Sequence, residues 1–242
     1  LWCAPDLSDL FMPLPTVILP GYLASAQPYQ EMESALAAQG YPAVTVPLRR
    51  RDWLPTVGGR SVINIVQILD ATAQRVMMDM GSKSINLVGH SAGGWISRIY
   101  LGEQPYNIHG SDRDRTTPRP ARSHVETLIT LGTPHTSQER WTRKNLDFVN
   151  QTYPGAFYDD VNYVCVAGKA VEGQQADWFT FNSYKLTGGD GFAWGDGIVP
   201  TSAAHLDGAE NMTFEQVFHS PRPKRLWYGS PEIVQKWCQW LV

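Results

Sequence analysis

The stretch that most constrains the fold is a short apolar run that ends in the pentapeptide Gly-His-Ser-Ala-Gly. The run covers residues 85–88, and residues compatible with a helix follow the pentapeptide at 95–101. A G-x-S-x-G pattern between a strand and a helix predicts a sharp turn that holds its serine, Ser91, in a strained conformation. Glycine is expected at positions 89 and 93 because side chains there would crowd the turn. The hydroxyl of Ser91 is therefore expected to be exposed at the end of a buried strand, although an ordinary glycine-rich turn is the alternative.

Short apolar runs alternate with helical segments along most of the chain. The predicted strands cover residues 16–19, 43–46, 85–88, 125–131, 161–166 and 214–218, and the predicted helices cover 30–39, 62–80, 95–101, 137–149 and 231–241. This alternation predicts an α/β fold, in which a mostly parallel central sheet has helices on both faces. No internal repeat or linker divides the sequence, so we expect residues 1–242 to form a single domain.

Two long stretches interrupt the alternation after the pentapeptide. Residues 102–123 are polar and contain prolines and a mixed-charge cluster, whereas residues 168–195 are rich in glycine and aromatic side chains. Open α/β sheets bind ligands beyond the carboxyl ends of their strands. We expect both stretches to be irregular lid or cap insertions beside a binding site.

Charge and residue spacing indicate which ligands and partners the chain is not expected to bind. The net charge of −3 provides no footprint for nucleic acid. No group of His, Asp or Glu residues has metal-ligand spacing, so neither a metal nor another cofactor is expected. The three cysteines, Cys3, Cys165 and Cys238, are far apart and fit neither a zinc site nor a dense disulfide framework. Cys165 lies in an apolar run and is expected to be a core residue.

The compartment is weakly constrained. No apolar stretch approaches the roughly 20 residues that span a bilayer. The sequence begins without Met and without a basic region leading into an apolar one, so a presequence could have been removed. A soluble protein of the cytoplasm or of a plastid-like compartment is favoured over a secreted one, with peripheral contact to a lipid surface left open.

A serine hydroxyl becomes a good nucleophile only when a base accepts its proton and an acid orients that base. In folds with this turn, the acid and then the base follow the serine along the chain. His219 directly follows the last predicted strand and is the expected base, with His205 in reserve. His135 also follows a strand but precedes any suitable acid, and His109 and His124 flank the charged stretch, where solvation is expected.

The expected acid is Asp196. It lies between two glycines on a loop that the apolar residues 198–200 anchor. Asp190 precedes a glycine a few residues earlier, where a simple turn is expected, and Asp207 is a third candidate. Asp196 and His219 then complete the order that this kind of turn predicts.

The intermediate of acyl transfer needs N–H donors for its oxyanion. The N–H of Ala92, directly after the serine, is one candidate. The second is expected on the loop after the first strand, where Pro20-Gly21-Tyr22-Leu23 follows the apolar run. We expect the Tyr22 N–H to be that donor, with Leu23 as its neighbour and a simple Pro-Gly turn as the alternative.

Several blocks, taken together in chain order, resemble the α/β-hydrolase superfamily and its lipase-like and GPI-inositol-deacylase-like members of the plant, algal and cyanobacterial type. The matching blocks are 17–22, 87–95, 128–135, 195–200, 218–220 and 227–232, with Trp237 on the closing helix. The resemblance covers the chain from about residue 16 onward. It implies Ser91 as nucleophile, Asp196 as acid and His219 as base, with the oxyanion held by the N–H groups of Tyr22 and Ala92.

One departure concerns the oxyanion loop. Many lipases have His-Gly where this chain has Pro20-Gly21. The backbone donor survives that change, but the contacts of the missing histidine do not. The resemblance implies a serine carboxylic-ester hydrolase acting on an apolar small-molecule ester or lipid. An acyltransferase or amidase with the same triad, or a non-catalytic ligand-binding protein on the same fold, are the alternatives.

Overall fold

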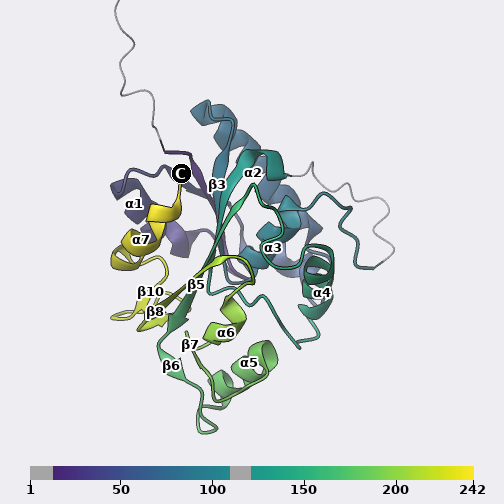
Figure 1. The fold of residues 1–242 in the computed structure, drawn as a ribbon, viewed down its shortest axis with the longest axis vertical. Helices are drawn as coiled ribbons and strands as arrows, with labels where there is room; N and C mark the ends of the chain where they lie inside the picture. The colour runs from purple at the N-terminus through teal and green to yellow at the C-terminus, as the bar shows by residue number, and fades with distance from the viewer. Residues whose placement is uncertain (1–12, 110–120) are drawn as a thin grey trace, which may run out of the picture.

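The computed structural model describes residues 13–109 and 121–242, and six parallel strands form its central sheet (Figure 1). The strands are β1 (Thr16–Leu19), β2 (Ala43–Thr45), β3 (Ile85–His90), β4 (Val125–Leu131), β5 (Asn162–Lys169) and β8 (Glu210–Glu215). They lie side by side in the order β2-β1-β3-β4-β5-β8, and every neighbouring pair is parallel. The predicted α/β fold class is confirmed.

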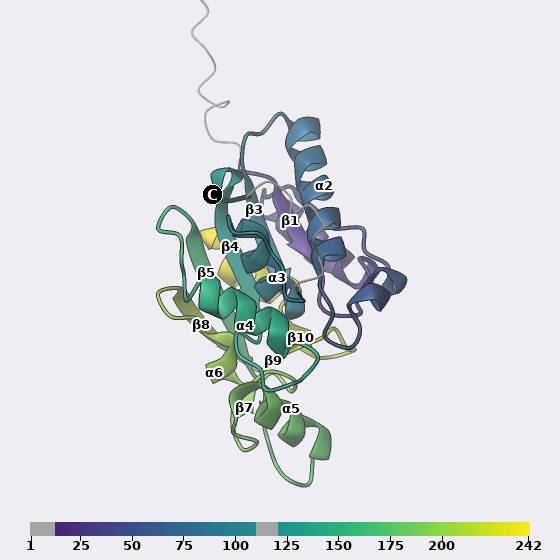
Figure 2. The same ribbon diagram turned by 90° about the vertical axis from the view of Figure 1, so that its right-hand side faces the viewer.

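Helices cover both faces of this sheet. The face seen in Figure 2 carries α2 (Ile63–Met80), α3 (Ala92–Leu101) and α4 (Arg143–Thr152), and the opposite face carries α1 (Gln30–Ala38) and α7 (Pro231–Trp237). Alternate strand side chains enter the two cores, as β1 illustrates: Val17 and Leu19 pack with α2 and α3, whereas Ile18 packs with α1 and α7. Because both faces are buried, these strands read in the sequence as continuous apolar runs.

The last strand of the main sheet differs from the prediction. Residues 214–218 were expected to form it, but the strand is β8, at residues 210–215, and it ends where Gln216 takes a positive φ of 62°. Beyond that residue, β9 (Val217–Phe218) pairs with β10 (Leu226–Trp227) in a separate two-stranded sheet. β8 lies at the sheet edge with four of its six residues exposed, so it lacks the apolar run by which the other strands were recognised.

Residues 168–195 are not irregular, contrary to expectation. They contain a hairpin of β6 (Val171–Glu172) and β7 (Trp194–Gly195), with α5 (Trp178–Gly188) between the two strands. The side chain of Asp177 accepts the Thr180 N–H at 3.2 Å and caps the start of α5, and Gly189 ends it with a φ of 84°. These capping residues were visible in the sequence, but the helix lacks a clear apolar face. The segment lies at the bottom of the ribbon in Figures 1 and 2.

Shorter elements complete the described chain. They are α6 (Thr201–Ala204) and the 3₁₀ turns Gln27–Tyr29, Arg50–Thr56, Ala121–His124 and Cys238–Trp240. The first predicted insertion, residues 102–123, lies largely outside the described residues, because 110–120 are not described. Among the helices that are described, none combines the length and the apolar character needed to cross a membrane.

Candidate active site

Three side chains from distant parts of the chain form one line of hydrogen bonds at the carboxyl ends of the strands. The Ser91 Oγ lies 3.0 Å from His219 Nε2, and His219 Nδ1 lies 2.7 Å from Asp196 Oδ2. Ser91 directly follows β3, Asp196 directly follows β7, and His219 directly follows β9. The structure therefore brings together the three residues that the sequence analysis singled out.

Ser91 lies on the sharp turn that the pentapeptide predicts. Its φ of 53° and ψ of −124° are strained for a residue with a side chain. A side chain at Gly93 would overlap the carbonyl oxygen of Leu19 on β1, and a Cβ at Gly21 would lie only 3.0 Å from the Ser91 Cβ. These two glycines allow β1 and the loop after it to approach the turn, whereas a side chain at Gly89 would overlap the backbone of Gly93 and Gly94 within the turn itself.

The carboxylate of Asp196 is buried, and hydrogen bonds surround it. Oδ1 accepts the N–H groups of Ile198 and Val199 at 2.9 and 2.7 Å, and Oδ2 accepts the Tyr228 hydroxyl at 2.8 Å as well as His219. Burial raises the pKa of Asp196, but the attraction of His219 and these hydrogen bonds outweigh it and hold the pKa below its usual value. The carboxylate is therefore charged at neutral pH and fixed in orientation.

Tyr228 is a contact that the sequence analysis missed. Its hydroxyl oxygen accepts the Gly168 N–H at 2.8 Å and donates to Asp196. Burial, followed by the negative charge of Asp196, raises the pKa of Tyr228 well above its usual value, so the phenol keeps its proton. The block 227–232 had been matched to the superfamily, but a single sequence carries no sign that this side chain reaches the acid.

The two expected oxyanion donors flank Ser91. Ala92 is the first residue of α3, where backbone N–H groups have no partner within the helix. Tyr22 lines a cavity of about 290 Å³ together with Gly21, Ser91 and His219, and its ring packs edge-on against Trp53 at 5.3 Å. Within the part of the chain that the structure describes, neither N–H group donates a hydrogen bond. Both remain candidates for the oxyanion hole.

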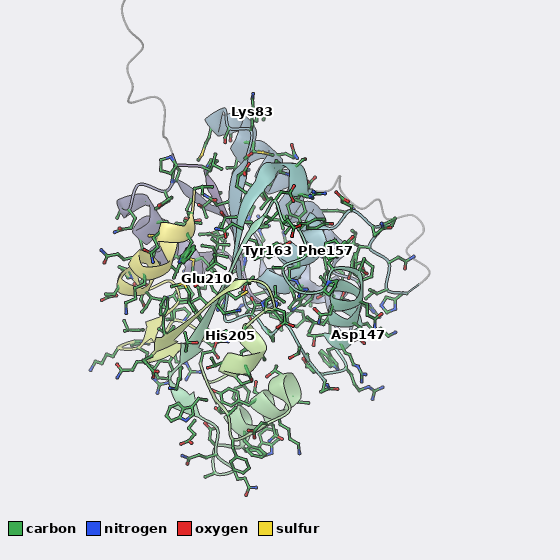
Figure 3. All side chains as sticks on the ribbon, in the orientation of Figure 1. Lys83, Asp147, Phe157, Tyr163, His205 and Glu210 are labelled. Carbon is green, nitrogen blue, oxygen red and sulfur yellow. The ribbon has the colours of Figure 1, made fainter. Side chains whose placement is uncertain are left out.

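The other candidate bases lie away from Ser91. His205, labelled in Figure 3, follows α6, and its Nε2 lies 3.1 Å from Thr213 Oγ1. His135 is buried, with its Nδ1 3.4 Å from an Arg98 nitrogen. His124 lies beside Tyr100, and His109 is exposed. His124 is half-buried, which differs from the solvated position expected for it.

The other residues that the sequence analysis considered have structural roles. Asp190 forms the expected turn, in which its Oδ1 accepts the Phe192 N–H at 2.9 Å. The carbonyl of Asp207 accepts the Ala156 N–H on a loop outside the site. Cys165 is buried in the core, as predicted. Within residues 13–109 and 121–242, no group of three or more His, Cys, Asp or Glu side chains could hold a metal ion.

Comparison with known proteins matches part of the chain to one family model, the PGAP1-like alpha/beta domain, over residues 57–164. A search of curated proteins gives no match. Among solved structures, the product of gene lin2722 from Listeria innocua has 14% identity and a TM-score of 0.53, covering 95% of this chain and 93% of that one. Est1E from Butyrivibrio proteoclasticus has 14% identity and a TM-score of 0.52, covering 94% of this chain and 88% of that one.

The family match covers under half of the chain, whereas both structural matches extend over almost its whole length. At such low identity, the structural matches establish the fold and leave the reaction to be argued from the site. By its parallel sheet, its strand-turn-helix at Ser91 and these structural matches, the chain has the α/β-hydrolase fold.

Proposed function

We propose that the protein is a serine carboxylic-ester hydrolase of the lipase or esterase kind. The observation that carries this proposal is the continuous hydrogen-bonded line from Ser91 Oγ through His219 to Asp196 beside an open cavity. A base within hydrogen-bond reach of the serine, itself oriented by a buried carboxylate, is what activates a hydroxyl for acyl transfer.

In the first half of the reaction, Ser91 Oγ attacks the ester carbonyl carbon while its proton passes to His219 Nε2. The charge of Asp196 stabilises the resulting imidazolium, and the N–H groups of Tyr22 and Ala92 stabilise the oxyanion. The intermediate then expels the alcohol oxygen, which takes the proton from His219. An acyl group remains bonded to Ser91.

In the second half, water attacks the acyl carbonyl and gives a proton to the same base. Collapse of the second intermediate breaks the bond to Ser91 Oγ, which recovers its proton from His219, and the carboxylic acid leaves. An acyltransferase would use another alcohol in place of water, and an amidase would expel an amine. Both share this site. A non-catalytic binding protein has no need for the aligned proton path.

A fluorophosphonate probe tests the proposal directly. We expect it to modify Ser91, located by peptide mass, and we expect His219→Ala to lower the labelling rate at least about 100-fold, because general-base catalysis contributes on that order. Arg225→Ala, which removes an exposed side chain stacked on Phe218, provides a loop control with near-normal labelling. A folded protein that the probe leaves unmodified would favour the binding-protein alternative.

An apolar substrate is supported by a surface beside the site. Trp178, Phe179, Phe192 and Trp194 have exposed fractions of 73%, 60%, 56% and 45%, and we call them the aromatic patch. A cavity of about 580 Å³ is lined by both Phe179 and His219. Clustered exposed aromatic side chains mark an interaction surface, and Trp and Phe suit the boundary between water and lipid. We propose that the aromatic patch contacts the surface of an aggregated ester or lipid substrate.

Replacing Trp178 and Phe192 together by serine is expected to lower activity on an emulsified ester by about 30-fold, because each buried aromatic ring contributes on the order of 1 kcal/mol to surface binding. Hydrolysis of a water-soluble short-chain ester should stay unchanged. Phe157→Ser is the matched control, since Phe157 is 44% exposed and packs against Tyr153 and Tyr158 away from the site. Equal losses on both substrates would show that the aromatic patch has no role at a lipid surface.

A further inference from the structure

A second line of hydrogen bonds connects the oxyanion loop, which contains Gly21 and Tyr22, to the loop that carries the base, His219. The Gly21 N–H donates to the Tyr29 hydroxyl oxygen at 2.8 Å, and that oxygen lies 2.7 Å from His90 Nδ1. The other ring nitrogen, His90 Nε2, lies 2.9 Å from the carbonyl oxygen of His219. We call Tyr29 and His90 the bridge.

The chemistry of the partners fixes where the protons lie. Because its oxygen already accepts the Gly21 N–H, the Tyr29 hydroxyl donates its own proton to His90 Nδ1. A carbonyl can only accept, so His90 carries its proton on Nε2 and donates it to His219. Burial, followed by repulsion from His219, lowers the pKa of His90 to about 3, and burial raises the pKa of Tyr29. Both groups therefore stay neutral at physiological pH.

Packing leaves the bridge little freedom. Tyr29 is 3% exposed and His90 is 4% exposed. Both rings meet Trp227 edge-on, at 5.8 and 5.9 Å, and the His90 ring lies 4.9 Å from the ring of His219. Rigid packing around a fully satisfied hydrogen-bond line holds each group in one position.

The two ends of the bridge coincide with the two halves of the catalytic site. At one end, Gly21 directly precedes Tyr22, whose N–H is the expected oxyanion donor. At the other end, His90 donates to the backbone carbonyl of His219, and the ring of that same residue contacts Ser91. The chain has Pro20 where many lipases have histidine, and here a tyrosine from the 3₁₀ turn Gln27–Tyr29 reaches the adjacent glycine instead.

We propose that Tyr29 and His90 are positioning residues that hold the oxyanion loop and the base loop at a fixed separation around Ser91. This inference depends on the proposed function, since it concerns the geometry of the same reaction. Tyr29 and His90 line the cavity beside Ser91, but their hydrogen bonds go to Gly21 and to the His219 carbonyl, so the bridge acts through these two residues. Small displacements of such groups lower catalysis more than substrate binding, because the transition state demands closer alignment than the ground state.

The first test is Tyr29→Phe, which removes the acceptor for Gly21 and the donor to His90 while keeping the ring. For a soluble ester, we expect kcat to fall by about 10- to 100-fold and KM to change by less than about threefold. A boronic-acid transition-state analogue should lose affinity by a similar factor. Tyr106→Phe is the matched control: Tyr106 is 2% exposed and its hydroxyl accepts the Val62 N–H at 3.0 Å outside the site. It should lower Tm by a comparable amount and leave kcat unchanged.

The second test asks whether the bridge acts as one unit. Asn at position 90 places its amide oxygen near the former Nδ1, so His90→Asn keeps an acceptor for Tyr29 but cannot reach the His219 carbonyl. The double variant Tyr29→Phe/His90→Asn should be only slightly slower than the slower single variant, because either change breaks the same line. Additive losses, or a Tyr29→Phe variant with kcat within twofold of wild type, would overturn the inference.

The outcomes separate this inference from the proposed function. If wild type hydrolyses esters, Ser91→Ala does not, and Tyr29→Phe matches wild type, the hydrolase proposal stands and the bridge has no positioning role. If wild type hydrolyses no ester but is labelled at Ser91, the labelling rates of the same variants decide the question. A wild-type protein that is neither active nor labelled contradicts both proposals.

Discussion

Replacing Ser91 by alanine is expected to lower kcat for a soluble ester by about 10⁴- to 10⁶-fold, since loss of the nucleophile leaves only binding and the oxyanion donors. The change removes a single oxygen, the one that lies 3.0 Å from His219 Nε2. The cavity beside Ser91 keeps its other lining residues, so binding of a non-hydrolysable ester analogue should change by less than about threefold. Initial rates and analogue binding by calorimetry measure the two effects.

The thermal stability of variants at Ser91 provides a test that is independent of activity. The φ of 53° at Ser91 is strained for any residue with a Cβ, and alanine has one. Ser91→Ala should therefore keep a Tm close to that of wild type. Ser91→Gly should be equally inactive but more stable by about 1 kcal/mol, because relief of 1–3 kcal/mol of backbone strain exceeds the added entropy of an unfolded glycine.

Ser34→Ala serves as the control for both measurements. Ser34 is an exposed serine on α1 whose hydroxyl contacts only the Gln30 carbonyl among the described residues. It should behave as wild type in rate and in Tm. Ester hydrolysis by Ser91→Ala at the wild-type rate would contradict the proposed mechanism, and a Ser91→Gly variant less stable than Ser91→Ala would show that the turn is not strained.

Local patterns made the core of the fold and the serine turn predictable. Strands such as β1 and β4 are buried on both faces, so their apolar runs stand out at the residues where the structure has them. The turn at Ser91 depends on glycines within a few residues of it. The expected order of the triad along the chain, and the rule that site residues follow strand ends, then left only a few candidate acids and bases after Ser91. Of these, His219 contacts Ser91, and Asp196 contacts His219.

Contacts between distant segments could not be predicted in this way. The hydroxyl of Tyr29 reaches a residue 61 positions away, and His90 reaches a carbonyl 129 positions away. Nothing local distinguishes these side chains from other core residues. The edge strand β8 was misplaced and the aromatic helix α5 was missed for a related reason, because each leaves much of its surface exposed: β8 has no continuous apolar run, and α5 has no clear apolar face.

Replacing Asp196 by asparagine is expected to lower kcat by about 10³- to 10⁴-fold, because a base held in the wrong tautomer cannot accept the serine proton. The surroundings of Asp196 dictate how the amide would lie. Two backbone N–H groups, from Ile198 and Val199, point at Oδ1, so the amide oxygen must take that position. The NH₂ group then faces His219 Nδ1 and donates to it. The proton of His219 moves to Nε2, where it blocks transfer from Ser91.

The same replacement should also destabilise the fold. The NH₂ group would meet the Tyr228 hydroxyl, which now donates to Asp196 Oδ2 and would lose its acceptor. A buried group left without a partner costs about 1–3 kcal/mol, which a lowered Tm would record. Asp190→Asn is the control, since that carboxylate lies on an exposed turn and accepts a backbone N–H that an asparagine oxygen can also accept.

An Asp196→Asn variant that keeps more than a tenth of the wild-type kcat would show that Asp196 does not set the tautomer of His219. If activity fell but Tm did not, Asp196 would orient His219 for catalysis, and its contact with Tyr228 would make no contribution to stability.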